Sequence, residues 1–273
     1  MQKLLNGSVL ADYIQERQGR QARALIQAEG ITPKLAIVLT VDNPVIETYI
    51  GLKQRYGAEI GVSVELHRVE QSQASATIKK LNKDDSVHAI IVQLPLQDPS
   101  QTEEIVNQVS PSKDVDGLGK DPLFDPATPM AIMWLLAGYN VDLKNKQILL
   151  VGRGKLVGAP LEKMFKTSGL NVMVVTREEG DLKKAAPEAD VIITATGSPA
   201  ILYSEIIKPG AVLVDAGVAS EAGKTVGDLA PSVYERDDIT VTPVKGGVGP
   251  LTVCALFDNV LRAARPTPKT SAQ

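Results

Sequence analysis

The feature of this sequence that most constrains its fold is the alternation of short β-branched runs with amphipathic stretches. The apolar runs occupy 35–41, 62–69, 87–94, 147–151, 171–176, 191–195, 211–215 and, briefly, 239–241. Helical patterns fit 8–28, 45–60, 74–81, 130–137 and 251–264. Strands that alternate with helices build parallel sheets whose faces the helices cover. We therefore predict an α/β protein.

The stretch between Pro95 and Pro129 is rich in proline and glycine, and its hydrophobic periodicity largely fails. We place the crossing between two domains there, and 273 residues suffice for two modest domains that share a cleft. The first domain is expected over 1–120 plus 250–273, since the last helix has an apolar face to pack back on it. The second, over 121–249, is expected to be a Rossmann-like nucleotide-binding domain.

Charge and cysteine usage limit the classes of partner and compartment. The net charge of −3 gives no basic field for nucleic acid, so we expect no nucleic-acid partner. The single cysteine, Cys254, excludes an internal disulfide and is typical of a reducing compartment. The N-terminus turns polar after a few residues and no apolar run is long enough to span a bilayer. We expect a cytoplasmic protein that does not associate with membranes.

The second half contains a glycine turn directly after an apolar strand. Val151 is followed by Gly152, Gly154 and Gly158. In a strand–turn–helix corner, glycines let the backbone approach a phosphate and the helix N-terminus attracts negative charge. The spacing is not the usual G-x-G-x-x-G, so a plain tight turn is the alternative. The cations Arg153 and Lys155 within the turn favour the nucleotide interpretation.

Arg177, at the end of the next strand, bears on the choice of cofactor. That strand end reads the adenosine ribose in such folds, where an acidic residue favours a free 2′-hydroxyl and an arginine suits a 2′-phosphate. Arg177 therefore favours NADP over NAD. Because Glu178 and Glu179 follow at once, NAD stays possible. A solvated surface arginine is the alternative.

Three side chains of the first half are candidates for chemistry. Tyr49 and Lys53 stand four residues apart in a predicted helix and share a face, although such a pair usually forms only an amphipathic edge. Lysine acts as an acid or base only if its surroundings lower its pKa. Gln93 interrupts an apolar strand near its carboxyl end, where ligands bind in open α/β sheets. A ligand, a lysine or the loop backbone would satisfy its amide.

Two further motifs are open to both functional and structural interpretations. Asp114 and Asp116 stand two apart, but no further ligand follows at a metal-binding distance, and a solvated turn is the stronger alternative. The glycine-dense run at 246–249 is typical of a ligand lip or of a hinge. His67 and His88 lack metal-ligand spacing, so we expect structural roles for both and no metal site.

Taken in order, six segments resemble the bifunctional methylenetetrahydrofolate dehydrogenase/cyclohydrolase family. They are Tyr49 to Lys53, Val92 to Leu96, Lys113 to Gly117, Thr128-Pro129, Gly152 to Pro160 and Gly246 to Thr252. Each is modest alone, but six in register across nearly the whole chain are specific. The resemblance implies two domains with the folate between them, a nicotinamide cofactor on the second, and a homodimer formed through the nucleotide domain.

The resemblance also implies roles for individual positions. Lys53 is the general acid/base, Tyr49 faces the pterin, Gln93 orients the lysine and Asp116 grips the pterin ring. The implied folate contacts further include Val92, Leu94 and the lip Gly246, Gly247, Val248 and Gly249. The cofactor would bind at Gly152, Arg153, Gly154, Arg177 and Val218.

The implied chemistry has two steps and belongs to one-carbon metabolism and purine biosynthesis. Methylenetetrahydrofolate is oxidised by NADP+, and water then attacks the methenyl cation to give 10-formyltetrahydrofolate. We expect repulsion from that cation to lower the pKa of Lys53.

The chain departs from the family pattern at several positions, among them Ile46, Ala127, Gly154 and Lys245. At Gly154 the family has serine. Two rivals therefore stand beside this prediction. One is a dehydrogenase of another small acid or alcohol, and the other is a folate- or nucleotide-binding regulator without catalysis.

Overall fold

The computed structural model describes residues 3–217, 219–221 and 224–266. The chain forms two compact units, which are described separately. The large-sheet unit comprises Met1–Asp12 and Thr128–Thr252, and the small-sheet unit comprises Tyr13–Ala127 and Val253–Gln273. The chain therefore crosses between units within its first helix, at the start of its fifth and within its last.

The small-sheet unit is built on three parallel strands in the order β3-β2-β4. Within it, Leu39 at the end of β2 pairs in register with Gln93 at the end of β4. The elements follow the predicted series closely: α1 (Gly7–Glu29), β2 (Lys34–Leu39), α2 (Pro44–Ile60), β3 (Ser63–Arg68), α3 (Gln71–Lys83), β4 (Ala89–Gln93) and α8 (Val248–Ala263), with α1 and α8 shared between the units. The predicted α/β architecture is confirmed in this half.

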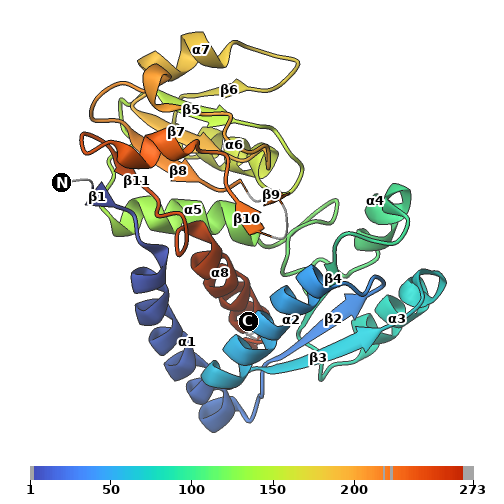
Figure 1. Ribbon diagram of the computed structural model, residues 1–273. Coiled ribbons are helices and arrows are strands. Elements are labelled where there is room, and N and C mark those ends of the chain that lie inside the picture. The colour runs from blue at the N-terminus through green and yellow to red at the C-terminus, as the bar shows by residue number, and fades with distance from the viewer. Residues whose placement is uncertain (1–2, 218, 222–223, 267–273) are drawn as a thin grey trace. The chain divides into compact units, whose positions relative to one another are not determined.

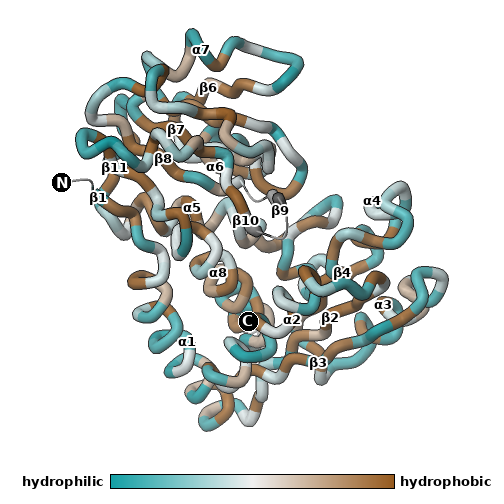
Figure 2. Tube along the Cα trace, in the orientation of Figure 1, coloured by the Kyte–Doolittle hydropathy of each residue, from teal (hydrophilic) through white to brown (hydrophobic). Residues whose placement is uncertain are grey.

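Alternating side chains of β2 divide the core of this unit between the two faces of the sheet. Ala36 and Val38 pack with Ile78 of α3, whereas Leu39 packs with Ile50 of α2. Figure 1 shows α2 and α3 on opposite sides of these strands. In Figure 2, β2 carries the hydrophobic colour expected of a strand buried on both faces.

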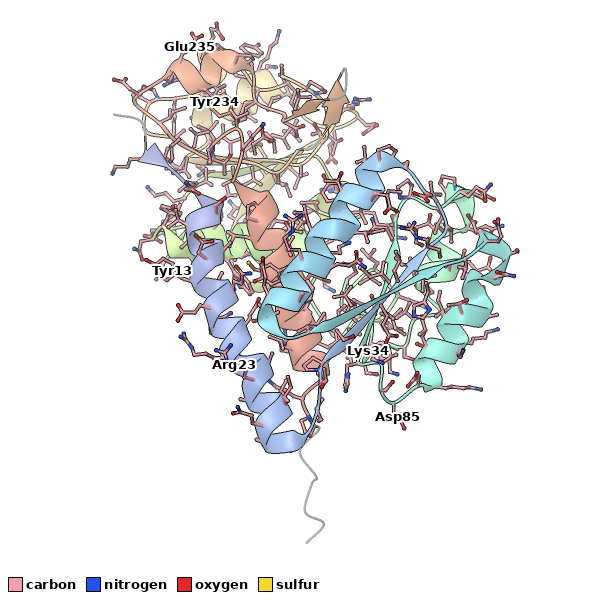
Figure 3. All side chains as sticks on the ribbon, turned by 60° about the horizontal axis from the view of Figure 1, so that its bottom comes forward. Tyr13, Arg23, Lys34, Asp85, Tyr234 and Glu235 are labelled. Carbon is pink, nitrogen blue, oxygen red and sulfur yellow. The ribbon has the colours of Figure 1, made fainter. Side chains whose placement is uncertain are left out.

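Gln93, at the end of β4, lies at the carboxyl edge of the small sheet, and the opposite edge is polar. Lys34 begins β2 and Asp85 precedes β4, and Figure 3 shows the two near each other at the amino edge.

Beyond β4 the sequence predicted an irregular stretch. The structure instead contains a 3-10 turn at Pro99–Gln101 and a short helix, α4 (Thr102–Val106). Helical periodicity is not detectable over five residues, so this element escaped prediction.

From Val253 onward, the last helix belongs to the small-sheet unit. Within α8, the Nδ2 of buried Asn259 donates to the carbonyl oxygens of Val115 and Asp125, both at 2.9 Å. The Phe257 ring lies 5.0 Å, centroid to centroid, from that of Tyr56 in α2. One amide thus fixes the loop that carries Asp116, because it bonds the residue immediately before it.

The large-sheet unit is built on six parallel strands in the order β1-β11-β8-β7-β5-β6. Figure 1 shows α6 and α7 on opposite sides of this sheet. Its elements are β1 (Lys3–Leu4), α5 (Ala127–Gly138), β5 (Ile148–Val151), α6 (Gly158–Thr167), β6 (Val172–Val175), α7 (Leu182–Ala185), β7 (Val191–Thr194), β8 (Val212–Asp215), β9 (Ala219–Glu221), β10 (Lys224–Val226) and β11 (Thr240–Val241), with 3-10 turns at Ala186–Glu188, Ser204–Ile206 and Pro231–Glu235. The order follows the doubly wound pattern of nucleotide-binding sheets, so the Rossmann-like prediction is confirmed.

One element of the large sheet was missed by the sequence. We expected residues 1–12 in the first domain, but β1 pairs with β11 through Lys3↔Thr240 and Leu4↔Val241. Two residues carry no period, so only the long-range pairing reveals the strand.

None of the helices in the described ranges combines the length and the apolar character that a membrane crossing requires.

Candidate functional site

Helix α2 presents Tyr49 and Lys53 from a firmly started helix. Asn43 caps it, since its side-chain oxygen accepts hydrogen bonds from the N–H groups of Val45 and Ile46 at 3.0 and 2.9 Å. The helix buries Ile46, Ile50 and Ile60 against the sheet. Tyr49 lies off this buried face with 42% of its surface exposed, and Lys53 is half-buried. A large exposed aromatic ring beside a shielded amine is a suitable surface for a flat heterocycle.

The amine of Lys53 is held by Gln93. Lys53 Nζ donates to Gln93 Oε1 at 2.7 Å, and Gln93 Nε2 donates to the Leu94 carbonyl oxygen at 2.9 Å. Two of the three partners considered for this amide therefore occur together, because its nitrogen bonds the loop backbone and its oxygen bonds the lysine. The backbone bond fixes which end of the amide faces the amine.

The two aspartates of the following loop have different roles. Asp114 is buried and accepts hydrogen bonds from the N–H groups of Gly117 (3.1 Å) and Gly119 (2.8 Å), so it shapes the turn. Asp116 is half-buried and interacts electrostatically with Lys53. Of the pair, only the second carboxylate joins the amine, which is the position that the family resemblance selected.

Burial controls the protonation of this site. Burial lowers the pKa of Lys53, and the Asp116 carboxylate opposes that shift. Burial also raises the pKa of Asp116, opposed by the positive charge of Lys53. Repulsion by a cationic intermediate was the expected cause for the lysine, but desolvation acts in the protein by itself. A neutral amine is therefore more accessible near neutral pH than on an exposed lysine.

In the large-sheet unit, the glycine turn after β5 is shaped by close backbone approach. Gly152 has φ = +101°, and its N–H donates to the Val175 carbonyl oxygen at 2.8 Å. A Cβ on Gly158 would meet the carbonyl oxygen of Gly152, whereas a Cβ on Gly154 would meet nothing within 4 Å. Two glycines are thus required by the backbone, and the third leaves open space. Such a corner before α6 offers backbone N–H groups to a pyrophosphate.

The cations of this corner are engaged by protein groups. Arg153 Nε donates to Glu162 Oε2 at 2.8 Å, and its Nη1 donates to Glu179 Oε2 at 3.1 Å. Arg177 Nη2 donates to the Ser198 hydroxyl at 2.9 Å. Carboxylates 9 and 26 residues away along the chain pair with Arg153. Val218, the other predicted cofactor contact, lies outside the described residues.

The glycine run at 246–249 is held by the segment that begins α1. Gly246 has φ = +83°, and its carbonyl oxygen accepts a hydrogen bond from the Ser8 N–H at 3.1 Å. Gly247 lies against Gly7, and Val248 and Gly249 already belong to the first turn of α8. This run belongs to the large-sheet unit, and the Lys53 cluster belongs to the small-sheet unit.

Two aspartates that the sequence did not single out, buried Asp228 and half-buried Asp215, support the carboxyl edge of the large sheet. Asp228 accepts hydrogen bonds from the N–H groups of Thr196 (2.8 Å) and Ser198 (2.9 Å). Asp215 accepts from the N–H groups of Gly217 (3.0 Å) and Asp228 (3.1 Å). The signal that could have found them is an aspartate at a strand end with glycines nearby. The pair positions the loop whose Ser198 bonds Arg177.

No group of three or more His, Cys, Asp or Glu side chains able to hold a metal ion occurs within the described part of the chain.

The sequence and fold match known proteins along nearly their whole length. The family description "Tetrahydrofolate dehydrogenase/cyclohydrolase, catalytic domain" matches residues 5–116, and its "NAD(P)-binding domain" matches residues 126–267. Curated relatives called bifunctional protein FolD include one from Staphylococcus saprophyticus (34% identical, 96% of this chain, 97% of the relative) and one from Methanosarcina barkeri (36%, 96% of each).

Solved structures of similar fold have the same family names as the sequence relatives. FolD from Campylobacter jejuni superposes with a TM-score of 0.90 at 34% identity, covering 97% of this chain and 99% of that chain. A Trypanosoma brucei methylenetetrahydrofolate dehydrogenase-cyclohydrolase, solved with NADP cofactor and an inhibitor, superposes at 0.89 with 27% identity, covering 96% and 97%. This chain belongs to the tetrahydrofolate dehydrogenase/cyclohydrolase family.

Proposed function

We propose that this enzyme oxidises 5,10-methylenetetrahydrofolate to 5,10-methenyltetrahydrofolate with NADP+ and then hydrolyses the product to 10-formyltetrahydrofolate. The observation that carries the proposal is the hydrogen bond from Lys53 Nζ to Gln93 Oε1, 2.7 Å long, beside the Asp116 carboxylate. Its donor, acceptor and nearby anion stand at the carboxyl edge of a parallel sheet, where α/β enzymes bind their substrates.

In the hydrolytic step Lys53 moves the protons. Water adds through its oxygen to the methenyl carbon, and the neutral amine of Lys53 accepts the proton that the water loses. The bond from that carbon to N5 then breaks as the ammonium returns the proton to N5. The added hydroxyl releases its remaining proton to solvent, which leaves a formyl C=O on N10. Gln93 keeps the amine in place throughout, because its oxygen accepts a hydrogen bond from either protonation state.

The remaining residues of the site hold the substrate. We assign Tyr49 to the face of the pterin and Asp116 to its ring N–H groups, with Val92 and Leu94 beside them. An exposed aromatic ring and a half-buried carboxylate suit a flat heterocycle with polar edges. We also assign Gly246, Gly247, Val248 and Gly249 to the folate, on the family resemblance alone.

The cofactor is assigned to the large-sheet unit at Gly152, Gly154 and Arg177, with Arg153 and Val218 beside them. When bound, NADP+ supplies the acceptor for the hydride that the folate loses. The turn at Gly152 and Gly158 fits this group, because a side chain at either glycine would collide with backbone. Arg177 and Ser198 lie at the edge where the adenosine ribose is read, so they suit the phosphate-bearing form.

An absorbance assay tests the proposal. Purified protein with methylenetetrahydrofolate and NADP+ should produce NADPH, and loss of the methenyl absorbance should report hydrolysis. Lys53→Met should lower the hydrolytic rate at least about 100-fold. A dehydrogenase of another substrate would retain its activity in this variant. Tight folate binding with no turnover by the unaltered protein would instead favour a regulator.

We propose further that the enzyme acts in the cytoplasm as a homodimer, serves purine biosynthesis and has no nucleic-acid partner. The net charge of −3 supports the last point. Strand β6 lies at an edge of the large sheet and leaves Met173 57% exposed, which supports association through this unit. Light scattering after size exclusion should give twice the chain mass of 29.1 kDa. A monomer at micromolar concentration would contradict the dimer.

A further inference from the structure

The loop after β6 is built to hold one carboxylate beside the glycine turn. Thr176 Oγ1 accepts hydrogen bonds from the N–H groups of Glu178 (3.2 Å) and Glu179 (3.0 Å), and the Thr176 N–H donates to the Glu179 carbonyl oxygen at 2.8 Å. The preceding residue, Val175, accepts the N–H of Gly152 at 2.8 Å. The backbone therefore fixes this loop and the turn side by side, which brings Glu179 to Arg153.

Arg153 divides its donors between two carboxylates of different character. Its Nε and Nη2 bond Glu162 of α6 at 2.8 and 3.2 Å, and the Glu162 side chain is only 11% exposed. Lys166 Nζ adds a second cation to Glu162 at 2.6 Å. The third donor, Nη1, pairs at 3.1 Å with Glu179, whose side chain is 66% exposed. Glu162 thus fixes the guanidinium, and Glu179 occupies the donor that faces outward.

The carboxyl end of β6 is where this class of fold reads the adenosine ribose. A guanidinium there binds a 2′-phosphate through paired hydrogen bonds, whereas a carboxylate accepts a 2′-hydroxyl and repels a phosphate. In this protein the carboxylate Glu179 follows β6 and the guanidinium of Arg153 follows the neighbouring strand β5, and the two are paired with each other. A 2′-phosphate that uses Arg153 Nη1 must compete with the Glu179 carboxylate for it, whereas Arg177, two residues before Glu179, is paired with the neutral Ser198 hydroxyl.

We infer that Glu179 is the specificity-determining residue of this cofactor site, weakening NADP relative to NAD by occupying Arg153. The inference rests on the proposed function, since it concerns the same nucleotide site. Its consequence is an enzyme that uses NADP+ through Arg177 yet retains measurable use of NAD+. Removing the carboxylate releases Nη1 and removes the repulsion, while Glu162 keeps the guanidinium in place.

Glu179→Gln tests this, with Glu178→Gln as the matched control, because it removes the same charge one residue earlier from a side chain that is not the partner of Nη1. Calorimetry would compare adenosine 2′,5′-bisphosphate with 5′-AMP, and initial rates would compare NADP+ with NAD+. We expect Glu179→Gln to raise the preference for the phosphorylated member of each pair about tenfold, with at most about a twofold change for Glu178→Gln.

The outcomes separate the two proposals. Equal increases in both variants would show a general charge effect and overturn the assignment to Glu179, as would an unchanged ratio in Glu179→Gln. If the unaltered protein binds these nucleotides but oxidises no methylenetetrahydrofolate, the proposed function fails while the binding comparison still decides the role of Glu179. If it binds neither nucleotide, both proposals are overturned.

Discussion

Lys53 and Asp116 have opposite effects on each other's protonation, and burial acts on both. Burial lowers the pKa of Lys53, while the negative charge of Asp116 raises it and so keeps the ammonium form more stable. The lysine must be neutral to accept a proton from water and charged to return it. A pKa between the buried and the exposed extremes suits both halves of the hydrolysis.

Because the Asp116 carboxylate raises the pKa of Lys53, its removal should shift the pH dependence of hydrolysis. In Asp116→Asn the ammonium loses its stabilising neighbour, so the pKa of Lys53 should fall further and the acidic limb of kcat for hydrolysis should move to lower pH. Rates at saturating methenyltetrahydrofolate would measure this, since weaker substrate binding then affects KM alone. Glu47 lies on the same helix as Lys53 but pairs with Arg68 of β3. Glu47→Gln should therefore leave the acidic limb in place. A shift to higher pH would contradict the assigned interaction.

Helix α2 depends on its cap to present Tyr49 and Lys53. Asn43→Ala removes the acceptor of two N–H groups and should lower the free energy of unfolding by about 1 kcal/mol. Urea denaturation followed by circular dichroism would measure the change. Asn43→Asp retains a side-chain oxygen at the same position and should recover most of the loss. Equal losses in the two variants would show that the cap is not the cause.

A second prediction at the scale of elements concerns the strand–turn–helix corner at 151–158. Gly158→Ala places a Cβ against the Gly152 carbonyl oxygen and should force the turn apart, with loss of nucleotide binding and of more than about 1 kcal/mol in stability. Gly154→Ser, where the side chain meets open space, should change stability by at most about 0.5 kcal/mol. Calorimetry with NADP+ and thermal melts of both variants would check the contrast. Equal tolerance would contradict the close approach.

At the scale of the whole molecule, a single tryptophan reports on one of the two units. Trp134, the only tryptophan, lies in α5 of the large-sheet unit. NADP+ at 100 times its Kd should stabilise the transition that this residue reports by about 2.7 kcal/mol, since ligand binds the folded unit alone. Denaturation followed by tryptophan fluorescence measures the shift, with sodium chloride at equal ionic strength as the control. An unmoved transition would place the cofactor outside this unit.

The sequence by itself determined the α/β class, most of its strands and helices, and the family. Hydrophobic period is a local property, so most of the longer strands and helices could be located from it. The short elements β1, α4, α7, β9 and β10 could not, and α6 was expected only as the helix after the glycine turn, without bounds. The order of six motifs along the chain identified the family, because motif order is also legible without coordinates.

Only the tertiary structure decided which candidate side chains act together. Spacing and residue type do not separate Asp114 from Asp116, and only the family resemblance selected the second. In the fold, one shapes a turn and the other interacts electrostatically with Lys53. Gln93 is separated from Lys53 by 40 residues, and Arg153 from Glu179 by 26. Hydrogen bonds and ion pairs act over a few ångströms, so the partner of a polar group depends on how the sheet brings distant strand ends together. The sequence therefore located Lys53 and Arg153, and the fold showed which side chains each of them bonds.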